Sequence, residues 1–230
     1  MVLVWLSLKL ISMVIPNLSP LWISLKVSLS ATLITTILGT IAAYSIYSYQ
    51  GRGRSLINNL FLTPLLLPPT VVGFILLLLL GKNSPVGQFL AQGNIRVVFT
   101  WYGAVIAAAI VSFPLVYRAA LGAFSQIDRL LLDAARIEGA AEAEVLWYIA
   151  FPLAIPGVLG GIVLGFARAL GEFGATLMVA GNIPGQTQTI PMTIYFALEA
   201  GETGEGWFWT IIIMVTSFLG VWLLDIATQR

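Results

Sequence analysis

The residues that could do chemistry in this 230-residue chain are charged ones, and they gather in two places. One group lies between residues 128 and 144, where five carboxylates face only two arginines. The other is Arg168 and Glu172, four residues apart in an otherwise apolar run. The chain has no cysteine and no histidine, which excludes disulfides, the usual zinc sites, haem ligation by histidine, and Ser–His or Cys–His nucleophiles. The available chemistry is therefore ion pairing and contact with anions, with no resident metal or cofactor.

Composition identifies the environment that must position these charges. Hydrophobic residues make up 59% of the chain and charged residues only 9%, whereas a soluble domain carries about a quarter charged residues. The chain is therefore predicted to be an all-α integral membrane protein, with one transmembrane domain over residues 21–230. Charges are costly in hydrocarbon, so the polar segment 125–152 must lie in water between two spans. A net charge of +1 gives no reason to expect a nucleic-acid partner.

The apolar runs predict about five transmembrane helices, because one span needs about 20 apolar residues. The expected spans are residues 21–49, a second that begins after residues 63–70 and ends near 80, 101–121 with a break at Pro114, 153–180, and 207–226. Residues 1–20 are a poor fit to a full span, because the first 15 would reach only about 22 Å as a helix and Pro16 and Pro20 then interrupt the pattern. They are expected to form an interfacial segment, with a partial sixth span as the alternative.

The basic residues predict the orientation. The loop from 181 to 206 has no lysine or arginine and should face outward. Alternation then places six arginines on the cytoplasmic side, namely Arg52, Arg54, Arg118, Arg129, Arg136 and Arg230. The amino end would lie outside and the carboxyl end in the cytoplasm.

Two features within the spans suggest a pathway for a solute. Three prolines in six residues suggest a broken helix that lines a cavity, since irregular backbone at membrane depth persists only where it is buried or wetted; the alternative is simple helix initiation. The residues concerned are Thr63, Pro64, Pro68, Pro69 and Thr70. Arg168 and Glu172 are expected to form a structural ion pair, and Arg168 could also give positive potential to an anion pathway.

A stripe of small residues marks one face of the fourth span. Gly157, Gly161, Gly165 and Ala169 follow one another at intervals of four, so they share one helical face and permit close packing. Packing within the chain and a seam between two copies are both possible uses.

The segment from Asp133 to Pro152 resembles the cytoplasmic loop of ABC importer permeases. The family pattern is Glu-Ala-Ala, three residues, Gly, nine residues, Ile, one residue, Leu-Pro. The matching residues here are Asp133, Ala134, Ala135, Gly139, Ile149, Phe151 and Pro152, with Asp for Glu and Phe for Leu. The resemblance implies a coupling helix within 125–152 that docks in the ATP-hydrolysing subunit, and the acidic loop suggests a basic or polar rim on that docking cleft.

Four further stretches resemble the molybdate importer permeases: Leu67–Gly73, Ser112–Arg118, Phe166–Thr176 and Asn182–Pro191. This resemblance implies a type I ABC importer permease of the bacterial inner membrane, with five or six spans. It also implies a second copy of the chain, two ATPase subunits that hold ATP and magnesium, and an extracytoplasmic oxyanion-binding protein. Thr176, at the end of one stretch, joins the candidate pathway residues.

The sequence leaves other functions open. Sulfate and tungstate permeases share much of the pattern, so the transported anion is molybdate, tungstate or sulfate. The chain has no Walker-type phosphate loop, so ATP hydrolysis is expected on the partner and not here. An ion-coupled secondary transporter and a membrane scaffold subunit are the more distant alternatives.

Overall fold

The computed structural model describes the backbone of residues 17–228 and most of their side chains. This part of the chain is helical, with no strand. The elements are α2 (Ser19–Ser48), α3 (Arg54–Leu66), α4 (Pro69–Leu80), α5 (Pro85–Gln92), α6 (Trp101–Ser125), α7 (Arg129–Ile137), α8 (Glu142–Glu144), the π-helix η1 (Val145–Ala150), α9 (Phe151–Leu170), α10 (Gly174–Ala180), α11 (Ile190–Glu199) and α12 (Thr203–Thr228). The predicted interfacial segment 1–20 lies mostly outside the described residues, and its last two residues already belong to α2.

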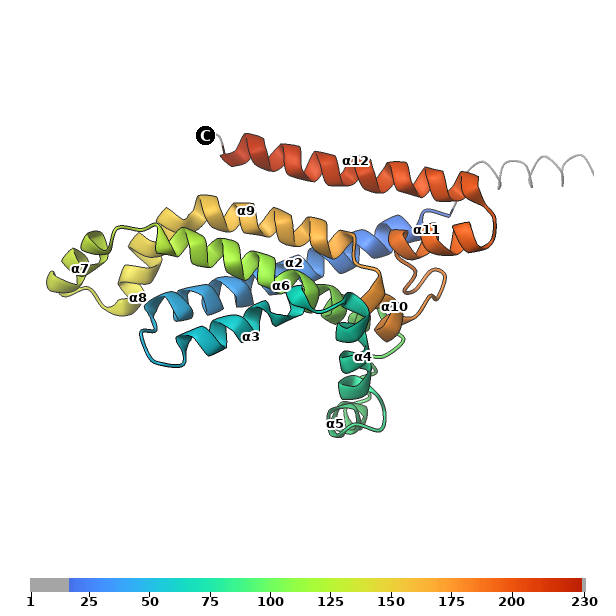
Figure 1. The fold of residues 1–230 in the computed structure, drawn as a ribbon, viewed down its shortest axis with the longest axis horizontal. Coiled ribbons are helices and arrows are strands. Elements are labelled where there is room, and N and C mark those ends of the chain that lie inside the picture. The colour runs from blue at the N-terminus through green and yellow to red at the C-terminus, as the bar shows by residue number, and fades with distance from the viewer. Residues whose placement is uncertain (1–16, 229–230) are drawn as a thin grey trace, which may run out of the picture.

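The long helices form an elongated bundle. α2, α3, α6, α9 and α12 run along its long axis, each opposite in direction to the one before, and this set is consistent with about five transmembrane helices (Figure 1). Among the described residues, α2, α6 and the continuous helix from Glu142 to Leu170 are each long and apolar enough to cross a membrane. α3 and α4 add a fourth span when they are taken together.

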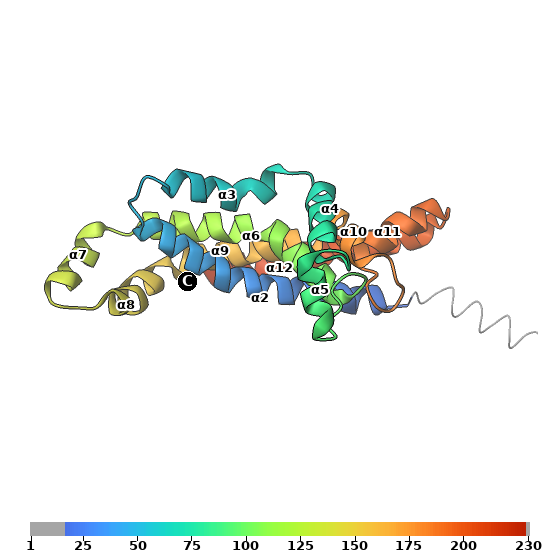
Figure 2. The same ribbon diagram turned by 90° about the horizontal axis from the view of Figure 1, so that it is seen from below.

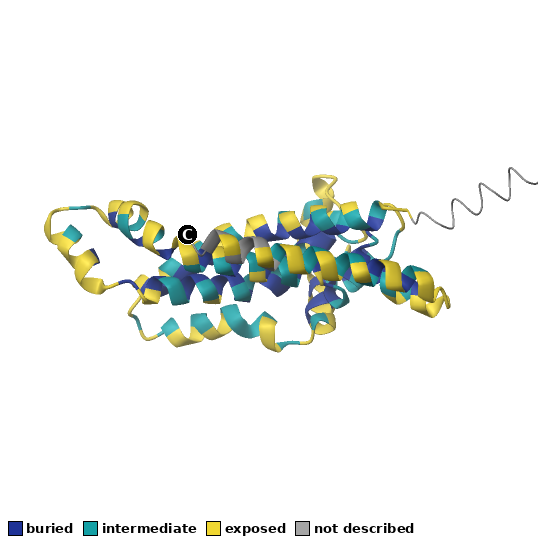
Figure 3. Ribbon diagram, turned by 90° about the horizontal axis from the view of Figure 1, so that it is seen from above, coloured by how far each residue is buried: buried dark blue, intermediate teal, exposed yellow. Residues whose placement is uncertain are grey.

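α6 lies at the centre because it is built from small residues. It packs most extensively against α2 and α9, and its fully buried residues include Ala104, Ala107, Ala108 and Ala120. Without a hydrophobic driving force in lipid, membrane helices associate through such close packing of small side chains. The exposed side chains lie along the outside of the bundle and on α7 (Figure 3).

The proline-rich stretch breaks a helix, as expected, but the second pass begins earlier than the sequence suggests. α3 starts at Arg54 and contains Pro64, and α4 then turns by 108° at Pro68 (Figure 2). Proline at position 69 fits the first turn of α4, where its missing N–H would have no partner anyway. The helix that runs along the bundle is therefore α3, before the break. The prediction placed this span after the break, at residues 70–80, and is wrong in that respect.

Two other predicted boundaries are also wrong. α6 continues through the buried Pro114; membrane helices tolerate the carbonyl that proline leaves unpaired, because neighbouring groups compensate. The fourth span ends at Leu170, and after Gly171–Phe173 the chain restarts as α10. The predicted fifth span, 207–226, falls inside α12.

Candidate functional site

The segment between α6 and α9 projects beyond the end of the bundle (Figure 1). α7 begins where Asp128 Oδ1 accepts a hydrogen bond from the backbone N–H of Leu130, at 2.9 Å, which satisfies one free donor of the first turn. The helix ends at Ile137, and Gly139, two residues further on, has a φ of +94°. The N–H groups of Gly139 and Ala140 donate to the carbonyls of Arg136 and Ala135, which is the Schellman arrangement that favours glycine at this position.

Arg136 holds the two arms of this turn together. Its Nη1 lies 2.7 Å from Asp133 Oδ1, and its Nε and Nη2 donate to the two carboxylate oxygens of Glu142 at 2.7 and 3.2 Å. These hydrogen bonds, that of Glu142 first, raise the pKa of the guanidinium, and the same contact lowers the pKa of the Glu142 carboxyl. Because all three side chains are largely exposed, each pair contributes only about 0–1 kcal/mol. The cluster serves mainly to fix the direction of the turn.

The second arm returns to the bundle through an irregular helix. Glu144 Oε2 accepts from the N–H of Ala141 at 2.8 Å, and the π-helix η1 then continues directly into α9. Pro152 has no N–H to donate to the carbonyl four residues earlier, and π-turns are frequent at functional sites. Three of the predicted coupling residues, Ile149, Phe151 and Pro152, lie at this junction between η1 and α9.

The projecting segment has one face in the core and one face uncovered. Leu132 and Val145 are buried in the same cluster as Tyr47 and Phe124 at this end of the bundle. Large apolar side chains on the other face are mostly exposed: Leu130 75%, Ile137 87%, Trp147 62% and Tyr148 79%. An exposed apolar surface next to polar residues is typical of a protein-interaction site.

The predicted coupling residues occupy this segment but not all of them its surface. Asp133, Ala134, Gly139 and Pro152 are exposed, whereas Ala135, Ile149 and Phe151 are half-buried. Sequence reasoning missed the Arg136 cluster and the exposed apolar side chains, although the 3.6-residue periodicity of Leu130 and Ile137 on a polar helix was a usable signal.

The candidate pathway residues separate into two groups. Pro69 and Thr70, at the start of α4, lie close to Gly174 of α10. A Cβ added to Gly174 would be 3.3 Å from both side chains. Next to them, Glu172 Oε1 accepts from the N–H of Ala175 at 2.9 Å, and Thr176 is buried.

The second group lies on the other side of the break. Thr63 Oγ1 donates to the carbonyl of Asn59 within α3. Pro64 lines an apolar groove with Thr35, Phe61 and Phe113, and Pro68 is exposed at the turn itself. The structure thus brings Pro69, Thr70, Glu172 and Thr176 together and leaves Thr63 and Pro64 apart from them.

Arg168 and Glu172 form the predicted ion pair. Arg168 Nη1 lies 2.7 Å from Glu172 Oε2, although without the alignment of a hydrogen bond. The Glu172 side chain is 1% exposed and that of Arg168 28%. A buried carboxylate needs such a partner, and part of the guanidinium stays accessible.

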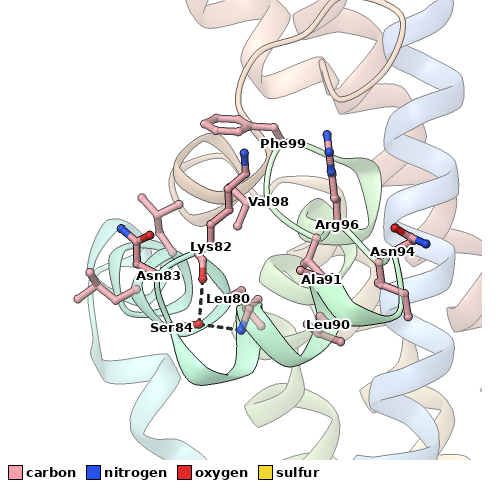
Figure 4. Close-up of a pocket in the computed structure, with 16 residues that line it drawn as sticks. Leu80, Lys82, Asn83, Ser84, Leu90, Ala91, Asn94, Arg96, Val98 and Phe99 are labelled. Atoms are coloured by element: carbon pink, nitrogen blue, oxygen red, sulfur yellow. Dashed lines mark hydrogen bonds between the residues drawn. The ribbon is translucent and has the colours of Figure 1, made fainter.

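A cavity of about 920 Å³ lies beside α4 and α5, and it carries positive charge. Lys82 and Arg96 extend toward the same side of it, near Phe99, whereas the Ser84 hydroxyl caps α5 by accepting from the N–H of Gly87 at 2.8 Å (Figure 4). The backbone of Asn94 and of Phe99 has positive φ, so the loop that closes this cavity is conformationally constrained.

The small-residue stripe of α9 lies against α6 of the same chain. A Cβ on Gly157 would lie 2.5 Å from Ala123 Cβ, and one on Gly161 would lie 2.8 Å from Ala119 Cβ. Gly165 would similarly meet Val116 Cγ2 at 2.6 Å, and Ala169 is buried with residues of α2 and α6. This face is therefore filled within the chain.

The bundle and its projecting segment define a polytopic membrane protein in which a helical segment beyond the end of the bundle is available to bind another protein. Residues 35–230 match the family described as binding-protein-dependent transport system inner membrane component. The chain belongs to this family, and it is therefore an inner-membrane transport subunit rather than an enzyme.

Relatives of known description match almost the whole chain. The putative molybdenum transport system permease protein YvgM of Bacillus subtilis is 45% identical over 90% of this chain and 92% of its own length. The molybdenum transport system permease protein ModB of Escherichia coli K12 is 39% identical over 94% and 96%. A probable sulfate transport system permease protein, cysT of Prototheca wickerhamii, is 30% identical over 89% and 80%.

Solved structures show the same fold at low identity. The MetNI methionine ABC transporter in an inward-facing conformation has a TM-score of 0.70 at 14% identity, covering 91% of this chain and 93% of that chain. A bacterial ABC transporter for the acidic polysaccharide alginate has a TM-score of 0.68 at 16% identity, covering 94% and 82%. The fold is that of the type I ABC importer permeases.

Proposed function

We propose that this chain is the permease of an ATP-driven importer that moves molybdate into the cytoplasm. The observation that carries the substrate is the likeness to the two molybdenum transport permeases, at 45% and 39% identity over at least 90% of each chain. The sulfate relative is more distant, at 30%. Tungstate and sulfate are the alternative anions, since all three are tetrahedral and doubly charged.

The importer would contain two copies of this chain, two ATPase subunits and an extracytoplasmic binding protein. The family description supports a binding-protein partner, and the exposed apolar face on 130–148 supports an ATPase partner. In the proposed orientation this segment and the carboxyl end lie in the cytoplasm, and the amino end lies outside. The cavity beside α4 and α5 then lies toward the outer side.

The projecting segment would act as a lever. Leu132 and Val145 fix it to the core, and the Arg136 cluster fixes its turn, so the ATPases would move it as one body when they bind ATP. α6 and α9, on either side of the segment, pack too closely to slide independently.

The path for the anion would lie at the junction of α4 and α10. The break at Pro68 gives α4 an orientation different from that of α3, and irregular backbone in a membrane is stable where it lines a pathway. Pro69, Thr70 and Thr176 would border the gate, and the accessible part of Arg168 would supply positive potential. Oxyanion selection would lie mainly on the binding protein.

The test is ATPase activity in proteoliposomes that contain this chain, its ATPase and its binding protein. Molybdate and tungstate should each stimulate hydrolysis, and sulfate should not. Stimulation by sulfate alone would reassign the substrate. Failure of the chain to form a complex with any ATPase would overturn the proposal and favour the secondary transporter or the scaffold subunit.

A further inference from the structure

The cytoplasmic end of the bundle carries a second cavity, of about 620 Å³, between the start of α3 and the last turns of α6. Its location in the cytoplasm rests on the orientation proposed above. Three arginines line it: Arg52 from the α2–α3 turn, Arg54 from the start of α3 and Arg118 from α6. The other polar side chains in its wall belong to Ser55, Asn58 and Ser125, and none of the described residues that line it is a carboxylate.

These arginines are not neutralised by neighbouring acids. Among the side chains that the structure describes, the ion pairs involve only Arg136 and Arg168. The Tyr117 hydroxyl donates to Asn58 Oδ1 at 2.8 Å, which anchors the Asn58 side chain on α6. The nearest acidic residues along the chain, Asp128 and Asp133, already accept from Leu130 and Arg136.

The start of α3 adds to the positive potential of this cavity. Gly53 is the N-cap and carries no side chain that could accept from the first turn. The free N–H groups of a helix start attract anions, and Ser55 of this first turn lines the cavity.

We propose that this cavity binds a tetrahedral oxyanion, held by Arg52, Arg54 and Arg118. Guanidinium groups bind such oxyanions through paired charge-assisted hydrogen bonds, and the serine and asparagine side chains supply neutral donors. Arginines scattered at the inner surface of a membrane follow from topology alone. Convergence of two segments on one acid-free cavity does not. The bound group is either a free anion from the cytoplasm or the phosphate of an anionic phospholipid, which basic pockets on this side also attract.

Gly122 provides a variant that separates a site from diffuse positive charge. It lines the cavity, and a Cβ at this position would have no atom within 4 Å. Gly122→Leu therefore places an apolar side chain in the cavity wall, keeps all three arginines and favours the helical state of α6. Arg96→Gln, in the cavity beside α4 and α5, removes the same charge elsewhere and is the matched control.

The test measures binding to the purified full chain in phosphatidylcholine nanodiscs, by calorimetry with molybdate and with inorganic phosphate. Anionic lipid retained by the protein is measured by mass spectrometry. Each of Arg52→Gln, Arg54→Gln and Arg118→Gln should weaken binding about tenfold, as expected for one charge-assisted hydrogen bond. Gly122→Leu should weaken it as strongly, and Arg96→Gln should have no effect.

The two sources of the oxyanion give different results. A free-anion site binds molybdate or phosphate whether or not phosphatidylglycerol is present. A lipid site retains phosphatidylglycerol through purification, and that lipid blocks the free anions. The proposal is overturned when wild-type protein binds neither, or when Gly122→Leu and the arginine variants bind like wild type. The measurement needs no ATPase, so its outcome is independent of whether the chain is a molybdate permease.

Discussion

One added methyl group on α9 should push α9 away from α6 at Gly157 and be harmless at Gly160, three residues further on. A Cβ on Gly157 would lie 2.5 Å from Ala123 Cβ, whereas one on Gly160 would have no atom within 4 Å. Gly157→Ala and Gly160→Ala are therefore a matched pair, since both make the same chemical change on the same helix.

The expected magnitude follows from the missing space. Saturated carbons in contact lie about 3.5–4.0 Å apart, so α6 and α9 must move about 1 Å apart at Gly157. Ala123 Cβ is attached directly to the backbone and cannot rotate away. Overpacking of this kind costs about 1–3 kcal/mol, and both variants gain about 0.5–1 kcal/mol from replacing glycine in a helix. The gain cancels between them, so their stabilities should differ by the overpacking cost alone.

The assay is thermal unfolding of the purified protein in one detergent, followed by ATPase stimulation in proteoliposomes. For a chain of this size, about 1–3 kcal/mol corresponds to a difference of roughly 2–12 °C in Tm. Gly157→Ala should also lose stimulation, because the lever requires α6 and α9 to move together. Equal Tm values for the two variants would refute the close packing, and a lower Tm with full stimulation would refute the lever alone.

Three other changes test single contacts. Gly139→Ala should cost about 1–2 kcal/mol, because a φ of +94° is unfavourable for a residue with a Cβ, and it should reduce ATPase co-purification. Gly139→Asn should reduce co-purification less, because asparagine tolerates this region better. Equal losses in the two variants would contradict the conformational argument. Arg136 lowers the pKa of Glu142, so the stabilisation of the turn by this pair is present above the unfolded pKa of about 4.3 and is lost as pH falls through the lower folded pKa. Hydrogen exchange at residues 137–142, corrected for intrinsic rate, should therefore rise only in that acidic range. A rise near neutral pH would contradict the contribution of the pair. Glu172→Gln should lower Tm by leaving Arg168 unpaired, and Arg168→Gln added to it should restore part of the loss; no restoration would mean that the pair is not coupled.

Sequence reasoning succeeded where the deciding physics is local. The order of apolar runs, the helix break at Pro64–Pro69 and the pairing of Arg168 with Glu172 each depend on residues within one or two turns. The stripe through Gly157 and Gly161 follows from helical periodicity. These features need no knowledge of which helix lies opposite.

The features that the sequence did not predict depend on contacts between residues far apart in the chain or across a turn. The sequence does not predict that α3 starts at Arg54, and the Tyr117 hydroxyl that accommodates Asn58 comes from a distant part of the chain, α6. The bond between Arg136 and Glu142 spans six residues and exists only because the Schellman turn at Gly139 reverses the chain. The sequence therefore shows five carboxylates in this segment but not that one guanidinium engages two of them.

This engagement changes the expected nature of the ATPase contact. The acidic composition of 128–144 suggests that a basic or polar rim receives it, yet Asp133 and Glu142 are directed at Arg136. Large apolar side chains of the segment are exposed as well, Ile137 and Tyr148 most of all. Truncating Ile137 to alanine should then weaken ATPase co-purification more than reversing the charge of Glu138, which has no ion-pair partner among the described residues. The opposite ranking, together with strong loss in high salt, would return the contact to electrostatics.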